Sequence, residues 1–280
     1  MADSDADVAI EQADAHHRAG RRADAEALCR LILERQPRHP GTLHLLARMA
    51  YAQNRLGPAL RLARLATRAA SSEPGYRNTL GIVLGDLRQW DGSVTAFAEA
   101  VRLDPACFEA HRNLGMALSR AGRADDAVTP LTRAAELRPL DPGAWTLLAS
   151  LHHARLNLSA AIDCRRRALA LRPDDPPAHS DLLATMHYSP SYSPDQLFAE
   201  HLAWAQRHEG PVLTRSSGRP FLNDPDAGRH LRVGYLSGDF HDHPISRFIF
   251  PLLTALGADG LGVLGEGLAS YRPFASSTSG

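Results

Sequence analysis

Small and apolar residues recur along residues 6–190 with a period of 34 residues. Within each period, three positions hold small side chains. These are Ala47, Gly81, Gly115 and Ala149 at the first, Ala25, Ala59, Ala127 and Ala161 at the second, and Ala66, Ala100, Ala134 and Ala168 at the third. A leucine precedes the first position, and a proline closes the period at Pro37, Pro105, Pro139 and Pro173. Self-similarity at a fixed period of this length indicates stacked helical units.

The period predicts five units, each made of two helices in an antiparallel hairpin. They cover residues 6–39, 40–73, 74–107, 108–141 and 142–175, and a sixth unit supplies only its first helix, Ala178–His187. Small side chains are expected where the two helices cross, so Ala127→Leu should destabilise the protein by about 1–3 kcal/mol through overpacking. The prolines end the second helices, and Gly20 and Gly122 should lie at turns inside their units.

The pattern changes after Tyr188. Ser193, Pro194 and Gln196 form the signature of a capped helix start, which predicts a helix over Pro194–Glu209 that ends at Gly210. Residues 211–229 mix Gly, Pro, Ser, Asn and Asp. We therefore interpret residues 191–229 as a capping helix followed by a linker.

A different element begins at LRVGYLSGDFHDHP, residues 231–244. The short apolar run Leu231–Ser237 is typical of a buried parallel strand. It leads through a polar loop into the apolar segment Ile245–Leu256. Strand, loop and helix in this order predict the start of an α/β, Rossmann-like domain over residues 230–256, with any ligand beyond the carboxyl end of the strand.

The remaining residues, 257–280, are rich in glycine and serine and carry no pattern. Gly260, Gly262 and Gly265 fit the bare spacing GxGxxG, but no strand precedes them and too little chain follows for a βαβ unit. We interpret them as a glycine-rich loop in a disordered tail. One strand and one helix cannot bury both faces of the strand, so the apolar surface of residues 231–256 should be exposed and favour association.

Composition limits the classes of partner that the chain is expected to bind. The sequence has no lysine, so all 31 basic residues are arginine, and the formal net charge is zero. No basic stripe stands out, which argues against nucleic acid. The acidic start is no signal peptide, and no apolar run reaches membrane-spanning length. We interpret Cys29, Cys107 and Cys164 as small buried hydrophobic residues in a reducing cytoplasm.

Histidines are the candidate metal ligands. The pairs His16-His17 and His152-His153 recur at one repeat position, but consecutive helical residues do not face one another, and we interpret them as half-buried helix histidines. His241 and His243 form an H-D-H pair with no further ligand cluster to support a metal site. We expect neither a metal nor a cofactor to be bound by this chain.

The 34-residue pattern resembles the tetratricopeptide repeat. The resemblance implies a mainly α protein, a right-handed superhelix (α-solenoid) whose concave groove, lined by first helices, binds a protein or an extended peptide.

A second resemblance covers residues 176–255. The stretch AHSDLLATMHYSPSYSPDQLFAEHLAWAQRH and the later LRVGYLSGDFHDHPISRFI are similar to the junction in bacterial, Spindly-like protein O-GlcNAc transferases. In that family the histidine matching His243 lies in the active site, and the donor is UDP-GlcNAc. The family's donor site also includes a lysine of a second domain. The resemblance therefore implies a truncated α/β part and a chain that is inactive alone.

Two other functions stay open. The chain could be a functional glycosyltransferase subunit completed by a missing C-terminal half, or an independent repeat adaptor. Some transferases of this family capture peptides with a ladder of asparagines in the groove. The matching positions hold Leu45, Thr79, Asn113, Leu147 and Asp181. Only Asn113 fits, which makes it the single candidate residue for that mode of binding, against the alternative of a lone polar residue on a solvated face.

Overall fold

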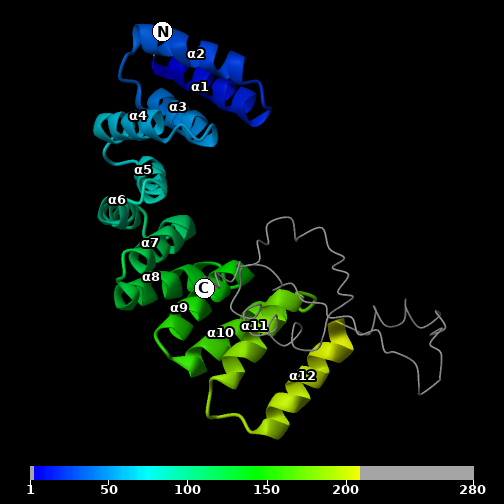
Figure 1. The fold of residues 1–280 in the computed structure, drawn as a ribbon. Coiled ribbons are helices and arrows are strands. Elements are labelled where there is room, and N and C mark those ends of the chain that lie inside the picture. The colour runs from blue at the N-terminus through cyan, green and yellow to red at the C-terminus, as the bar shows by residue number, and fades with distance from the viewer. Residues whose placement is uncertain (1–2, 209–280) are drawn as a thin grey trace, which may run out of the picture. The chain divides into compact units, whose positions relative to one another are not determined.

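The computed structural model describes residues 3–208, and all of its regular structure is helical in that range. The helices are α1 (Asp3–Arg18), α2 (Arg22–Arg35), α3 (Pro40–Ala52), α4 (Leu56–Ala69), α5 (Pro74–Asp86), α6 (Trp90–Leu103), α7 (Phe108–Arg120), α8 (Ala124–Leu137), α9 (Pro142–Ala154), α10 (Leu158–Leu171), α11 (Pro176–His187) and α12 (Pro194–His208). Ten of them form five hairpins that follow one another along the chain, from α1–α2 to α9–α10 (Figure 1).

Helix ends follow the sequence signals closely. Prolines begin α3, α5, α9, α11 and α12, where a missing N–H costs nothing. The predicted helix from Pro194 is confirmed through His208, the last residue that the structure describes. Its capping box is present, since the Ser193 N–H donates to Gln196 Oε1 at 2.8 Å and the Gln196 N–H donates to Ser193 Oγ at 3.3 Å. Helix α11 begins two residues before the predicted Ala178.

The two helices of each hairpin cross at the small residues. Ala25, Ala59, Ala127 and Ala161 are fully buried. A β-carbon at Gly81 would lie 2.6 Å from the Phe97 ring. One at Gly115 would lie 2.4 Å from Leu131 Cγ. Such distances leave no room for a methyl group, so the close approach predicted for these positions is confirmed.

Neighbouring hairpins pack through a second set of contacts. The second helix of one hairpin packs on the first helix of the next, and the largest core cluster, around Phe97, Phe108, Leu131 and Leu148, runs across three hairpins. In addition, α1 contacts α3, α3 contacts α5, α5 contacts α7 and α7 contacts α9. The described second helices make no comparable contacts with one another. The first helices therefore lie on the shorter side of the array, and we call their solvent-exposed surface the inner face.

One junction is looser than the others. Helix α2 makes fewer contacts with α3 than any later second helix makes with its successor. A cavity of about 490 Å³ lies there, with Leu33, Leu46, Met49 and Leu62 among its lining residues. On the first helix of the first hairpin, Glu11 and Gln12 are exposed. The terminal hairpin is thus the most weakly packed of the five.

The predicted strand Leu231–Ser237, the helix Ile245–Leu256 and the tail 257–280 lie outside the described residues. A Rossmann-like part therefore stays a prediction. Cys29 and Cys164 are buried, as predicted, whereas Cys107 is only half-buried at the start of α7. All three cysteines are free thiols.

Candidate functional site: the inner face of the array

Polar side chains link successive first helices along the inner face. Each link joins residues about one period apart. The links are Arg48 Nη1 to Asp14 Oδ1 at 3.1 Å, His44 Nε2 to Thr79 Oγ1 at 2.8 Å, Tyr51 Oη to Asp86 Oδ2 at 2.6 Å, and Asn113 Nδ2 to Asn78 Oδ1 at 3.0 Å. They fix the spacing of neighbouring first helices and satisfy polar groups that would otherwise be only partly hydrated.

Two residues of these links have a shifted pKa. Burial, together with the nearby Arg48 guanidinium, lowers the pKa of His44 to about 4, so its ring is neutral at neutral pH. The hydrogen bond to Asp86 and burial raise the pKa of Tyr51 to about 12. His44 also stacks against Tyr76, with ring centroids 4.4 Å apart.

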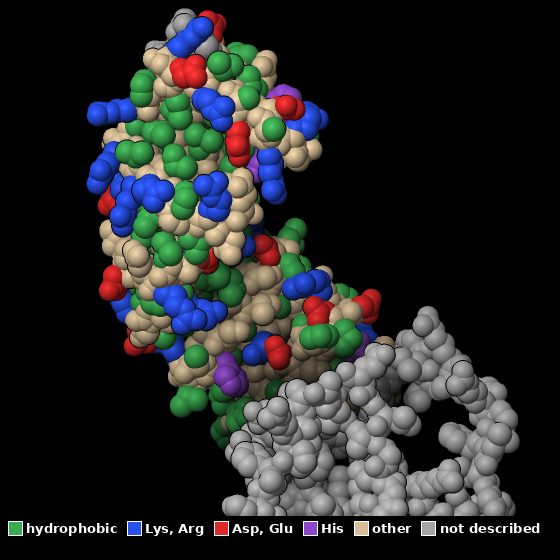
Figure 2. All heavy atoms as spheres, turned by 45° about the horizontal axis from the view of Figure 1, so that its top comes forward, with side chains coloured by type: hydrophobic (Ala, Val, Ile, Leu, Met, Phe, Trp, Pro, Cys, Tyr) green, Lys and Arg blue, Asp and Glu red, His purple; other side chains and the backbone are tan. Residues whose placement is uncertain are grey.

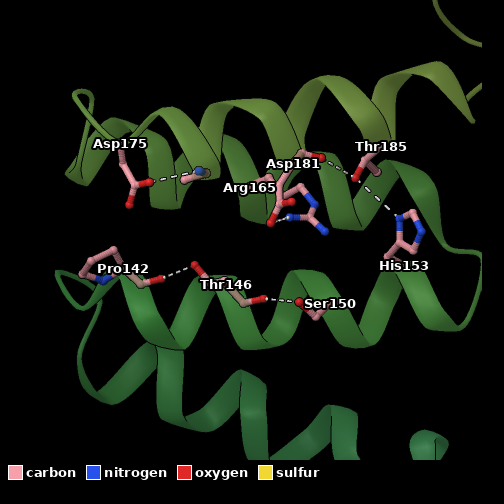
Figure 3. A network of polar contacts seen from close by, with 9 residues as sticks. Pro142, Thr146, Ser150, His153, Arg165, Asp175, Asp181 and Thr185 are labelled. Carbon is pink, nitrogen blue, oxygen red and sulfur yellow. Dashed lines mark hydrogen bonds and ion pairs between the residues drawn. The ribbon is translucent and has the colours of Figure 1, made fainter. Parts of the chain in front are cut away.

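A denser polar network joins α9, α10 and α11 (Figure 3). On α9, the Thr146 hydroxyl donates to the Pro142 carbonyl and the Ser150 hydroxyl to the Thr146 carbonyl. On α11, the Thr185 hydroxyl donates to the Asp181 carbonyl at 2.9 Å, so it can only accept from His153 Nδ1, 3.5 Å away. These hydroxyls donate hydrogen bonds to backbone carbonyls and do not form a set of catalytic groups.

Asn113 lies on α7, half-buried, at the contact with α5. Its amide nitrogen donates to Asn78, and its oxygen accepts from Arg112 Nη2 at 3.4 Å. The side chain is therefore already engaged in a contact between first helices, and its role in peptide capture stays a prediction. His243 lies outside the described residues, and its catalytic role stays a prediction too.

A stripe of side chains on α7, exposed at Met116 and Arg120 and half-buried at Arg112, offers different chemistry. Arg112, Met116 and Arg120 follow at intervals of four residues, which places them within about 80° of one another on the helix. Met116 is 41% exposed. Arg112 rests over the Phe108 ring at 5.7 Å and its Nε atom has no partner. Within residues 3–208, neither arginine of the stripe forms an ion pair with a carboxylate.

The acidic residues of the same face are engaged elsewhere. Glu109, two turns before Met116 on α7, pairs with Arg138 at 2.7 Å. Asp86 on α5 accepts from Tyr51, and Asp14 on α1 pairs with Arg18 and Arg48. The middle of the inner face therefore has uncompensated positive charge on either side of an exposed apolar side chain. The sequence pattern did not single out this stripe, because its residues differ from repeat to repeat.

The helix histidines carry no metal site in the described range. His16, His17, His152 and His153 are half-buried, as predicted. His16 Nδ1 accepts from Arg21 Nε at 2.8 Å, and burial lowers the pKa of His152. Between residues 3 and 208, no three His, Cys, Asp or Glu side chains come together as a metal site requires. None of the helices in that range is long and apolar enough to cross a membrane.

Surface charge is mixed over the described hairpins. Figure 2 shows arginine side chains interspersed with hydrophobic and acidic ones on the visible face. This distribution differs from the continuous basic surface that nucleic-acid binding proteins present.

Comparison with known proteins identifies the repeat. Residues 78–142 and 117–176 match the model of the tetratricopeptide repeat family, so this part of the chain is similar to tetratricopeptide repeats. Similar solved structures include YrrB, described as "a TPR protein with an unusual peptide-binding site", at 21% identity and a TM-score of 0.55, covering 62% of this chain and 89% of that one. No curated protein matches the chain.

Two structures of MamA are also similar. One has 14% identity and a TM-score of 0.57, covering 66% of this chain and 98% of that one. The other, residues 41 to the end of MamA from Desulfovibrio magneticus RS-1, has 20% identity and a TM-score of 0.53, covering 64% and 97%. At these identities the likeness concerns the fold, an array of tetratricopeptide hairpins.

Proposed function

We propose that the repeat array recognises a protein segment in extended form along its inner face, and that the bound segment is acidic around an apolar residue. The observation that carries this proposal is the stripe Arg112–Met116–Arg120, in which Met116 and Arg120 are exposed, Arg112 is half-buried, and neither arginine pairs with a carboxylate within residues 3–208. YrrB, a tetratricopeptide protein of similar fold, has a peptide-binding site, which supports recognition of peptides as the general role.

The stripe also defines the spacing of the bound residues. Arg112 and Arg120 are two helical turns apart, about 12 Å along the axis. An extended peptide covers that length in about four residues. A segment with acidic residues at positions i and i+4 and an apolar residue at i+2 therefore presents matching charges on either side of Met116. Each arginine can hold a carboxylate through two parallel N–H donors.

Binding of labelled peptides tests this assignment. A peptide of the pattern Asp-x-Leu-x-Asp should bind, and the double variant Arg112→Gln/Arg120→Gln should weaken it about tenfold or more, since charge-assisted hydrogen bonds contribute about 1.5–3 kcal/mol each. The matched control is Arg61→Gln/Arg64→Gln on α4, which removes two exposed arginines from a second helix. Equal loss in both variants, or equal binding of a Lys-x-Leu-x-Lys peptide, contradicts the proposal.

The stretch LRVGYLSGDFHDHP supports a second candidate. Its resemblance to Spindly-like protein O-GlcNAc transferases suggests that residues 6–190 form the repeat array, residues 191–229 a capping helix and linker, and residues 230–256 the start of a glycosyltransferase domain. On this proposal the chain is related to these transferases and does not bind the donor alone. The free cysteines support a reducing, cytoplasmic setting for either candidate.

Donor binding separates the two candidates. Calorimetry of the purified chain with UDP-GlcNAc should give no heat of binding, because the donor site of the resembled family includes a lysine and this sequence contains none. Measurable binding that His243→Ala abolishes would overturn the inactive interpretation and favour a glycosyltransferase subunit. Peptide binding to the inner face is measured separately, so one result does not decide the other.

A further inference from the structure

Helix α12 is held to the rest of the array by few apolar contacts. None of its residues is fully buried. Leu197, with Tyr192 just before the helix, packs partly against Ile162, Leu182 and Met186. Phe198 and Leu202, at 70% and 48% exposed, lie outside that cluster. Polar contacts must therefore supply a large part of the attachment.

Two histidine pairs make the shortest of these polar contacts. His179 Nδ1 lies 3.1 Å from His208 Nε2, and His187 Nε2 lies 2.8 Å from His201 Nε2. Each pair joins α11 to α12. The pairs are about two helical turns apart on both helices, so one stands near each end of the antiparallel interface.

An imidazole pair at this distance needs one nitrogen to accept. Two neutral rings satisfy the bond, and so does one neutral ring with one protonated ring, since each state leaves an acceptor. Two protonated rings have no acceptor and place like charges about 3 Å apart. Of all side chains, histidine has the ordinary pKa that brings this change between pH 5 and 8.

The surroundings already disfavour the charged state of the better buried pair. Burial, then the charge of His208 and of Arg207, lowers the pKa of His179, while Glu200 acts in the opposite direction. The Trp204 ring lies 5.2 Å from the His208 ring, and the Trp204 Nε1–H donates to the Pro176 carbonyl at 3.5 Å.

Ion pairs also join the elements that meet at this interface. The ion pairs are Arg166–Glu200 at 3.6 Å between α10 and α12, Arg207–Asp174 at 3.8 Å between α12 and the loop before α11, and Arg165–Asp181 at 3.0 Å between α10 and α11. On α9, His153 faces Tyr188, with ring centroids 5.8 Å apart.

A metal does not account for the pairs as well as hydrogen bonds do. Structural zinc sites use four ligands and catalytic sites three. Each pair offers two, and no third His, Cys, Asp or Glu joins either of them among residues 3–208.

We propose that the two histidine pairs form a proton-operated clasp, which holds α12 on α11 at neutral pH and releases it in mildly acidic solution. The docked helix disfavours the second proton of each pair, whereas the released helix does not. The released state therefore binds more protons, and docking weakens as the pH falls below the ordinary histidine pKa. Release uncovers the apolar cluster of Ile162, Leu182 and Met186 at the end of the array.

Hydrogen–deuterium exchange of the full chain, corrected for the intrinsic pH dependence of exchange, tests the clasp. Protection of residues 194–208 should fall about tenfold or more between about pH 7.5 and about pH 5, while α7 and α8 lose much less of theirs. His187→Gln/His208→Gln keeps a donor and an acceptor in each pair without a second titrating ring and should abolish the pH dependence. His16→Gln, outside the clasp, should leave it unchanged.

A variant with the opposite effect distinguishes proton-dependent release of α12 from a purely structural role of the histidines. His201→Lys places a fixed positive charge in one pair, so a single proton on His187 now opens it, and release should move to higher pH. Several outcomes overturn the proposal: protection that is the same at both pH values, pH dependence that survives in the double glutamine variant, or protection at neutral pH that is lost on adding a chelator, which would indicate a bound metal.

Discussion

At the scale of single residues, the turn inside each hairpin shows what the repeat imposes on its sequence. Five residues at 34-residue intervals adopt positive φ: Gly20 at 76°, Asn54 at 56°, Arg88 at 57°, Gly122 at 77° and Leu156 at 59°. The glycines predicted these turns in two repeats. Arg88 and Leu156 have no local preference for that conformation, so only the repeat register, and not the residue type, could have located the turn there.

Leu156→Gly should stabilise the protein. A left-handed conformation strains a residue with a β-carbon, and Leu156 is 82% exposed, so little packing is lost. After allowance for the greater freedom of glycine in the unfolded chain, the gain should be about 0.5–1 kcal/mol. The readout is an increase in Tm. Gly122→Leu, at the same position of the preceding hairpin, should decrease it, and a change in the same direction for both variants would contradict the explanation.

Gly115→Ala should destabilise the protein even though alanine favours helices. The new methyl group would meet Leu131 Cγ at 2.4 Å. Overpacking destabilises by about 1–3 kcal/mol, which is more than the higher helix propensity of alanine stabilises the helix. The matched control is Gly75→Ala on α5, where a β-carbon meets nothing within 4 Å. Thermal unfolding should show a loss for Gly115→Ala and none for Gly75→Ala. The same crossing argument applies to Ala127→Leu.

At the scale of elements, helix positions were largely readable from sequence and helix attachments were not. The capping box at Ser193 and Gln196 needs only a four-residue pattern, and it predicted the start of α12. The histidine pairs depend instead on how α12 lies against α11, across 29 and 14 residues of sequence. Nothing local in either helix specifies that geometry.

Ser193→Ala should loosen the first turn of α12 without unfolding the array. Losing an N-cap costs a helix about 0.5–2 kcal/mol, but α12 contributes no fully buried residue to the core. Faster amide exchange confined to residues 194–198, with an unchanged main thermal transition, is the expected result. Ser191→Ala, whose hydroxyl has no cap role, is the control. A large decrease in the main Tm would show that α12 is integral to the fold.

At the scale of the whole molecule, the array could be predicted because many small, leucine and proline positions share the same 34-residue period. The side chains of the inner face could not be predicted from the period, because Arg112 and Met116 have no equivalents in neighbouring hairpins. The same holds for the asparagine ladder. Asn113 fits its register, yet its amide contacts Asn78, and this pairing depends on the offset between two hairpins.

Stability of the array should decrease as the pH falls below 7. Burial lowers the pKa of His44 to about 4, and it also lowers that of His152 and His179. The unfolded chain, with ordinary histidine pKa values, binds more protons in the range between about 6.5 and these lowered values. Calorimetric Tm should therefore decrease from pH 7 to pH 5. His44→Gln, which can still bond Thr79, should make that decrease smaller, and an equal decrease in the variant would point to other groups.

The contacts between first helices give the array an elastic property. Successive first helices touch, whereas the described second helices do not touch one another to a comparable extent. Changing the distance between successive second helices therefore disturbs fewer contacts than pushing successive first helices closer together. A segment that wedges between two first helices lengthens the short side and straightens that part of the array. The distance between labels on α2 and α10 should therefore increase when such a segment binds.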